Sequence, residues 1–216
     1  MKYSFYVANN QSAESCLNRI TFDSESKNGE VQLCDKLPQG VQFIAHNSVD
    51  KKVYAVIGSE KEDECILITY DYYQTKIHQI YQRRIKVHSA SYIYIDPTMR
   101  KAYLSDYLGS QFALIELDFK GIPKKGIQYF KLEGSGPVLE RQEKSHPHSI
   151  LIYKNNILFV PDLGSDCIWQ ILLEKDDSIG RTIENHVIPG SGPRHLCIAN
   201  KQRIIYVLSL IHISEP

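Results

Sequence analysis

One aromatic residue recurs in matching β-rich segments along this chain of 216 residues. The segments read SFYVAN, KVYAVIG, KAYLSDYLGS, ILFVPDLGS and IIYVLS, and their aligned aromatics are Tyr6, Tyr54, Tyr103, Phe159 and Tyr206. Successive aromatics lie 48, 49, 56 and 47 residues apart. A period just under about 50 residues is typical of a β-propeller or another repeat array. The chain is therefore expected to build a series of similar β units.

The third and fourth units each predict four short strands joined by tight turns. In the third unit the predicted strands are residues 90–96, 102–107, 112–118 and 127–133, and in the fourth they are 148–153, 157–162, 167–174 and 182–188. Four antiparallel strands joined by hairpins form one propeller blade. The predicted fold class is therefore all-β, an incomplete β-propeller of four-stranded antiparallel blades with about four of seven blades present. An antiparallel sandwich is the alternative.

The composition argues against several classes of partner. The chain carries 25 Lys and Arg against 25 Asp and Glu, so it has no basic excess to attract nucleic acid or an anionic membrane. No stretch approaches the roughly 18 apolar residues of a membrane span, and the first residues lack the apolar core of a signal peptide. The spacing of the five cysteines fits reduced thiols better than disulfides or a zinc site. We expect a cytoplasmic protein, and the sequence leaves its oligomeric state open.

The interval of 56 residues contains an insertion, EGSGPVLERQEKSHP, at residues 133–147. An insertion between blades lies on one face of the propeller, where propellers usually carry their sites. The inserted segment leads directly into the polar sequence HPHS, residues 146–149.

Counting back from the aligned aromatics identifies equivalent residues at the starts of the predicted first strands. Four residues lie 11 or 12 positions before the aromatic of their unit: Gln42, Ser91, His148 and Arg194. Propeller blades surround a central channel, and the first strand of each blade usually lines it. We therefore expect these four side chains to converge at one mouth of the channel, although up to 152 residues separate them in sequence.

His148 and Arg194 are the predicted catalytic pair. A histidine can move protons near neutral pH, and an arginine can hold a carboxylate, a phosphate or a developing oxyanion. Taken alone, such a histidine is more often a turn or packing residue, and such an arginine a surface or ion-pair residue. Their matched positions favour the functional interpretation. Together they suit the ring opening of an anionic ester.

Other polar residues near the predicted mouth of the channel are expected to bind substrate or to support the structure. We expect His146 to support the loop or to bind substrate, and Gln42 and Ser91 to line the channel as further substrate-binding candidates. Arg141 and Lys144, on the inserted segment, either reach a phosphate or are solvated loop charges; Arg141 is kept among the substrate-binding candidates.

Three more residues are expected to be structural. His195 alternates to the other face of its strand and is predicted to be packed there. Asp106 and Asp162 each lie three residues after an aligned aromatic. We expect both to cap strand ends through Asx-type turns.

Three elements of the sequence together resemble a known family. GSGPVLERQEKSHPHS, VPDLGSDCIWQ and PGSGPRHL follow the pattern of the seven-bladed propeller lactonases, which include propeller-type 6-phosphogluconolactonases and fungal carboxymuconate lactonizing enzymes. The resemblance is strongest from Gly134 to Leu196 and continues, more weakly, from Tyr6. It covers nearly the whole chain.

The resemblance implies a metal-independent site at the central channel, without a cofactor. Such a site carries a His from the HPH element, an Arg from the GPR element and a Glu soon after the next strand. The first two fall on His148 and Arg194. The third is absent, because the chain reads YVLSLIHISEP from Tyr206 onward.

The last nine residues, LSLIHISEP, break the repeat in mid-strand. They match the in-frame translation of a common transposase-based sequencing adapter. We therefore expect residues 1–207 to be the N-terminal part of a single seven-bladed propeller and residues 208–216 to be non-native. A piece of this kind exposes sheet edges, and we expect it to be inactive on its own.

The function expected of the full-length parent is hydrolysis of a sugar-acid lactone, most specifically 6-phosphogluconolactone in the pentose phosphate pathway. The expected partner is thus a small anionic lactone. Two alternatives stay open: an intramolecular lyase of the carboxymuconate lactonizing type, and a propeller that serves as a non-catalytic binding scaffold.

Overall fold

The computed structural model describes residues 1–10, 15–37, 40–59, 61, 63–73, 76–154, 156–199 and 204–211. Antiparallel sheets follow one another along these residues. The first sheet contains β1 (Lys2–Asn10), β2 (Ser15–Asp23) and β3 (Asn28–Leu37). The second contains β4 (Val41–Asn47), β5 (Lys52–Gly58), β6 (Cys65–Tyr73) and β7 (Lys76–Ile85).

The third sheet contains β8 (Ala90–Asp96), β9 (Lys101–Asp106), β10 (Gln111–Leu117) and β11 (Pro123–Lys131). The fourth contains β12 (Leu151–Tyr153), β13 (Ile157–Asp162), β14 (Cys167–Leu173) and β15 (Ile179–His186). The described part of the chain ends with the pair β16 (Pro193–Ala199) and β17 (Ile204–Ser209), and a short helix, α1 (Leu139–Gln142), lies between the third and fourth sheets. The described residues thus contain three four-stranded sheets, which confirms the predicted blade.

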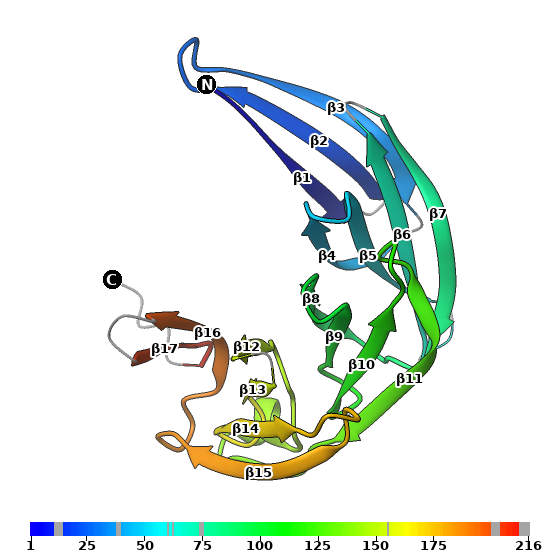
Figure 1. The fold of residues 1–216 in the computed structure, drawn as a ribbon. Helices are drawn as coiled ribbons and strands as arrows, with labels where there is room; N and C mark the ends of the chain where they lie inside the picture. The colour runs from blue at the N-terminus through cyan, green and yellow to red at the C-terminus, as the bar shows by residue number, and fades with distance from the viewer. Residues whose placement is uncertain are drawn as a thin grey trace.

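The sheets are arranged as an open arc (Figure 1). Within each sheet the strands pair in chain order, so the first strand lies on the concave side and the last strand on the convex side. In the second, third and fourth sheets the concave strands are β4, β8 and β12, and β16 continues this series. The arrangement is that of propeller blades around a channel, and it confirms the predicted all-β architecture.

Three predicted strand starts were wrong by three or four residues. β15 begins at Ile179 rather than at residue 182, beyond an irregularity in the β14–β15 register. β11 begins at Pro123, inside the predicted turn, because Leu117 pairs with Pro123 beyond an irregularity in the β10–β11 register. A proline can open a strand on a sheet edge, where its missing N–H is not needed. β12 begins at Leu151 rather than at His148, because the register of the inner strand shifts by one residue next to His148.

The aligned aromatics pack between neighbouring sheets. Tyr54 is fully buried in the cluster shared by the second and third sheets, and Tyr103 in the cluster shared by the third and fourth. The Tyr54 hydroxyl also donates a hydrogen bond of 2.6 Å to the Gly121 carbonyl in the next sheet. Tyr206, in the last described sheet, is 56% exposed. The repeat therefore places one ring in the layer between each sheet and the sheet that follows.

The two ends of the arc expose apolar side chains. Phe5 on β1 is 48% exposed and Leu208 on β17 is 58% exposed. Leu208 and Ser209 belong to β17, whereas residues 212–216 lie outside the described residues. Among the described residues, no helix has the length and apolar character of a membrane span.

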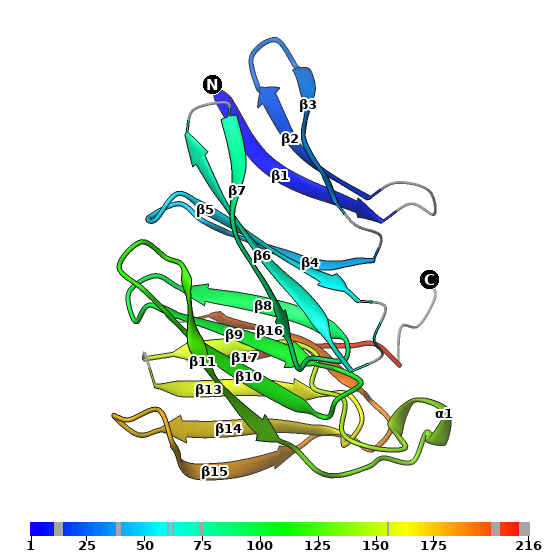
Figure 2. The same ribbon diagram turned by 90° about the vertical axis from the view of Figure 1, so that its right-hand side faces the viewer.

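The inserted segment, residues 133–147, folds back over the ends of the strands in the fourth sheet. Figure 2 shows α1 beyond the strand ends on one side of the arc. Gln142 is fully buried and anchors α1, because its Nε2 donates to the Leu163 carbonyl at 2.8 Å and its Oε1 accepts from the Val138 N–H at 3.0 Å. The insertion therefore lies on one face of the propeller, as predicted.

Candidate active site

A one-residue bulge recurs in the concave strands at the same position. In β4 the register shifts between Val41 and Phe43, in β8 between Ala90 and Tyr92, and in β16 between Pro193 and His195. The extra residues are thus Gln42, Ser91 and Arg194. A bulge bends its strand and redirects the side chains beside it.

The fourth sheet repeats the same shift. Pro147 pairs with Asp162 and Leu151 pairs with Phe159, so four steps along the inner strand oppose three steps along β13. The His148 N–H donates to the Pro161 carbonyl at 2.9 Å. His148 therefore occupies the bulge of its sheet, and the four residues found by counting in the sequence share one structural position.

In two sheets the bulge residue ties its blade to the next one. Gln42 Oε1 accepts the Ala90 N–H at 2.7 Å and the Cys65 thiol at 3.2 Å. Ser91 Oγ donates to the Pro147 carbonyl at 3.1 Å. The bonds with Ala90 and Pro147 hold neighbouring blades together at the bulge, whereas Cys65 belongs to the same sheet as Gln42. Substrate binding by Gln42 and Ser91 stays a prediction.

In the fourth sheet the hydroxyl of the following residue forms this tie. Ser149 Oγ donates to the Arg194 carbonyl, one blade further on, at 3.0 Å. The His148 ring is therefore not needed for this hydrogen bond between blades. Its Nδ1 is buried and has no hydrogen-bond partner within the described ranges of the chain.

Arg194 presents a second unpartnered polar atom at this place. Its Nε is buried without a hydrogen-bond partner among the residues that the structure describes. Buried polar groups in proteins are nearly always hydrogen-bonded, so an unpaired one calls for a partner such as a ligand or water. His148 and Arg194 both meet this criterion.

The electrostatic environment keeps the His148 imidazole neutral. Burial, followed by the positive charge of Arg194, lowers the pKa of His148 to about 4, and His195 and Arg141 act in the same direction. At neutral pH the ring is therefore a free base beside a guanidinium, the state in which an imidazole can accept a proton from water.

The prediction that His195 faces away from the site was wrong. Its ring centroid lies 5.3 Å from that of His148 and 5.8 Å from that of Tyr92. The cause is the bulge at Arg194, because an extra residue breaks the alternation of side chains along the strand. Burial, followed by the charge of Arg194, also lowers the pKa of His195.

His146 supports the loop. It is 2% exposed, its Nδ1 donates to the Tyr107 carbonyl at 2.8 Å, and its Nε2 lies 3.0 Å from the Glu143 carboxylate. Its ring also stacks on Tyr107 with a centroid distance of 4.3 Å. Both ring nitrogens are thus occupied, and of the two roles predicted for His146 these contacts favour loop support over substrate binding.

The two cations of the inserted segment differ in their contacts. Arg141, on α1, is exposed, and its positive charge contributes to lowering the pKa of His148. Lys144 Nζ donates to the Leu108 carbonyl at 2.8 Å. Of the two, Arg141 is the side chain better placed to meet an anionic ligand.

Asp106 and Asp162 are structural, as predicted. Asp106 accepts the N–H of Gly109 at 3.0 Å and Asp162 accepts the N–H of Gly164 at 3.1 Å, so both close Asx-type turns. Asp162 also accepts the His146 N–H at 2.6 Å. The second aspartate therefore fixes the HPHS segment to the end of β13.

The turn before Arg194 is built on a third carboxylate. Asp166 accepts the N–H groups of Gly190 and Gly192 at 2.6 and 2.8 Å. Both glycines have positive φ, 81° and 55°, which few other residues adopt without strain. The sequence PGSGPR thus forms a turn that leads directly into Arg194.

No group of three or more His, Cys, Asp or Glu side chains in the described ranges could hold a metal ion.

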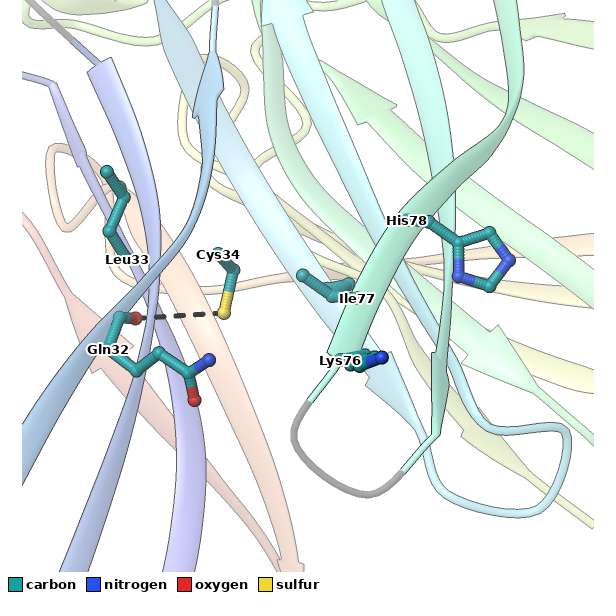
Figure 3. Close-up of a pocket in the computed structure, with 6 residues that line it drawn as sticks. All are labelled: Gln32, Leu33, Cys34, Lys76, Ile77 and His78. Atoms are coloured by element: carbon teal, nitrogen blue, oxygen red, sulfur yellow. Dashed lines mark hydrogen bonds between the residues drawn. The ribbon is translucent and has the colours of Figure 1, made fainter.

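A hollow between the convex strands β3 and β7 is lined by Gln32, Leu33, Cys34, Lys76, Ile77 and His78 (Figure 3). Burial raises the pKa of the Cys34 thiol, which also donates to the Gln32 carbonyl at 3.7 Å, so this thiol is a poor nucleophile. The hollow lies on the outer strands, away from His148 and Arg194.

Several known proteins resemble this chain in sequence. It is 29% identical over 183 residues to the 6-phosphogluconolactonase of Formosa agariphila, covering 81% of this chain and 52% of that protein. It is 22% identical over 211 residues to the 6-phosphogluconolactonase of Bacillus subtilis, covering 96% of this chain and 60% of that protein. The chain thus spans about half to three fifths of the length of these two relatives.

Solved structures share the fold. A protein of Lactobacillus plantarum superposes with a TM-score of 0.83 at 18% identity, covering 97% of this chain and 60% of that one. The periplasmic gluconolactonase of Pseudomonas aeruginosa gives 0.79 at 17% identity, covering 96% and 61%. The family model described as lactonase, 7-bladed beta-propeller, matches residues 4–209. The chain belongs to the seven-bladed β-propeller lactonase family.

Proposed function

We propose that the protein hydrolyses the lactone of an anionic sugar acid, namely 6-phosphogluconolactone to 6-phosphogluconate, as the names of its relatives indicate. One observation carries the proposal. His148 and Arg194 occupy the bulge in adjacent blades, and each keeps a buried polar atom without a partner in the described structure. A neutral imidazole beside a guanidinium is suited to activating water against an anionic ester.

The chemistry follows from the two side chains. His148 accepts a proton as the oxygen of a water molecule bonds to the lactone carbonyl carbon. The guanidinium of Arg194 stabilises the negative charge that develops on the carbonyl oxygen or holds the anionic group of the substrate. The bond from the carbonyl carbon to the ring oxygen then breaks, and the proton held by His148 passes to that oxygen. No net proton is taken up in this sequence of steps.

Arg141 adds a second positive charge at the mouth of the site. Its guanidinium is exposed on α1 and its charge acts on His148, so it is placed to meet a phosphate that extends from the lactone ring. A phosphorylated lactone therefore fits the site better than an uncharged one.

We also propose a cytoplasmic location and a longer parent protein. The five cysteines are all free, which fits a reducing compartment. The coverage of 52% and 60% of two relatives supports residues 1–207 as the N-terminal part of a single, longer propeller. The proposal that residues 208–216 are non-native rests on the sequence LSLIHISEP alone. Cell fractionation tests the first proposal, and sequencing of the gene beyond the codon for Val207 tests the second.

The substrate is identified by measuring the turnover of three candidate compounds by the product of the complete gene. The panel contains 6-phosphogluconolactone, the uncharged gluconolactone and carboxymuconate. We expect fastest turnover of the phosphorylated lactone, with a KM for Arg194→Gln raised tenfold or more, since a hydrogen bond to a charged group contributes about 1.5–3 kcal/mol. Faster turnover of carboxymuconate assigns a lyase instead, and turnover of none of the three leaves a binding scaffold.

A further inference from the structure

The orientation of His148 is set without a hydrogen bond from a neighbouring side chain. A catalytic histidine usually has its second ring nitrogen fixed by a carboxylate or a backbone carbonyl, which selects the tautomer and the ring orientation. In the described structure Nδ1 of His148 is buried and has no such partner. Ring packing must therefore supply the orientation.

Two aromatic rings contact His148. Tyr107 lies at a centroid distance of 5.7 Å with an interplanar angle of 78°, and His195 at 5.3 Å with 53°. Tilted and T-shaped arrangements are the favoured geometries of aromatic pairs, and each such pair resists rotation of its members. Tyr107 comes from the turn after β9, and His195 comes from β16.

Tyr107 is the more firmly held of the two. Its N–H donates to the Ser89 carbonyl at 2.8 Å, and its own carbonyl accepts His146 Nδ1 at 2.8 Å. The His146 ring also stacks on the Tyr107 ring, at a centroid distance of 4.3 Å and an interplanar angle of 17°. Glu143 and Asp162 in turn hold His146, through Nε2 at 3.0 Å and the backbone N–H at 2.6 Å.

Asp162, His146, Tyr107 and His148 are thus connected by successive contacts, which begin at the buried Asp162. Asp162 fixes His146, His146 fixes Tyr107, and the Tyr107 ring stands nearly perpendicular to His148. The Tyr107 hydroxyl takes no part in any of these contacts. The aromatic ring itself is the feature that acts on His148.

We propose that Tyr107 is the positioning residue of this site, and that its ring, held by His146, keeps the His148 imidazole in one orientation. The inference rests on the proposed function for its kinetic consequence. Its structural content, the fixed orientation of His148, is independent of the reaction.

The test compares Tyr107→Leu, which removes the ring, with Tyr107→Phe, which removes only the hydroxyl. Both variants are made in the product of the complete gene and assayed with 6-phosphogluconolactone. We expect kcat of Tyr107→Leu to fall about threefold to tenfold with KM changed less than about twofold, the range that corresponds to an aromatic pair. Tyr107→Phe is expected to match the wild type in both constants.

The second readout is the orientation of the His148 ring in crystal structures of the complete protein and its variants. We expect a single orientation in the wild type and in Tyr107→Phe, and more than one in Tyr107→Leu. Tyr107→Met serves if Tyr107→Leu does not fold, because it also keeps apolar volume without a ring. More than one orientation in the wild type overturns the proposal whatever the variants do.

Three results separate this inference from the proposed function. If folded Tyr107→Leu and Tyr107→Phe both keep the kcat of the wild type, the positioning role is overturned. If both variants lose kcat equally, the role is also overturned, because the hydroxyl would then be the active feature. If His148→Gln, measured alongside, keeps full turnover, the proposed function fails, while the crystal structures still decide whether Tyr107 orients His148.

Discussion

Replacing His148 with glutamine is expected to change how the stability of the protein depends on pH. In the folded protein the His148 pKa is lowered to about 4, first by burial and then by the charge of Arg194, whereas a histidine in the unfolded chain has its ordinary pKa of 6.5. Below about pH 6.5 the unfolded state therefore binds a proton that the folded state does not bind until the pH approaches about 4. The folded state is thus favoured at neutral pH, and this advantage is lost as the pH falls.

The magnitude follows from the two pKa values. One pKa unit corresponds to about 1.4 kcal/mol, so His148 alone lowers the free energy of unfolding by about 2.5 kcal/mol between about pH 7.5 and about pH 4.5. A glutamine at position 148 has no proton to bind in this range. The free energy of unfolding of His148→Gln should therefore fall by about 2.5 kcal/mol less than that of the wild type over the same interval.

Urea unfolding at a series of pH values measures the difference. Other titrating groups contribute to both curves and largely cancel in the comparison. His186→Gln is the matched control, because this histidine lies on the convex strand β15 and its side chain is 66% exposed. Parallel pH profiles for the wild type and His148→Gln would refute the claim that burial and Arg194 keep His148 neutral.

Two further substitutions test the scaffold of the site. Asp162→Asn should lower the free energy of unfolding by about 3 kcal/mol in urea titrations, because the fully buried carboxylate accepts hydrogen bonds from Ser145, His146, Gly164 and Trp169; a loss below about 1 kcal/mol would contradict its anchoring role. Ser149→Ala should cost only about 1 kcal/mol in the same titration and leave kcat within about threefold, because the hydroxyl ties two blades and touches no substrate in the proposed site; a large loss of turnover at unchanged stability would assign Ser149 to the chemistry.

The repeat made the blades and the ring of equivalent positions predictable. Spacing between aligned aromatics reports the length of one blade, because each ring enters the same layer between sheets, as Tyr54 and Tyr103 do. Counting from these rings therefore located Gln42, Ser91, His148 and Arg194 at one structural position. A period along the chain carries this information without knowledge of any contact.

The details at that position depended on contacts that no period records. The bulge was not predicted, and it explains why His195 turns toward His148 although simple alternation along the strand places it on the other side. The hydrogen bond between blades that Ser149, rather than the bulge residue His148, forms was also not predicted, because it depends on the Arg194 carbonyl of the next blade. Tyr107 was missed for the same reason, since its role arises from packing against His146 and His148.

Turnover of 6-phosphogluconolactone by the product of the complete gene, with and without His148, decides whether His148 is the base. We predict that His148→Gln lowers kcat by about 100-fold or more, the range of general acid–base catalysis, while the melting temperature at neutral pH stays close to that of the wild type and His186→Gln retains full activity. Unchanged turnover in a folded His148→Gln variant would contradict the proposed mechanism and remove His148 from it.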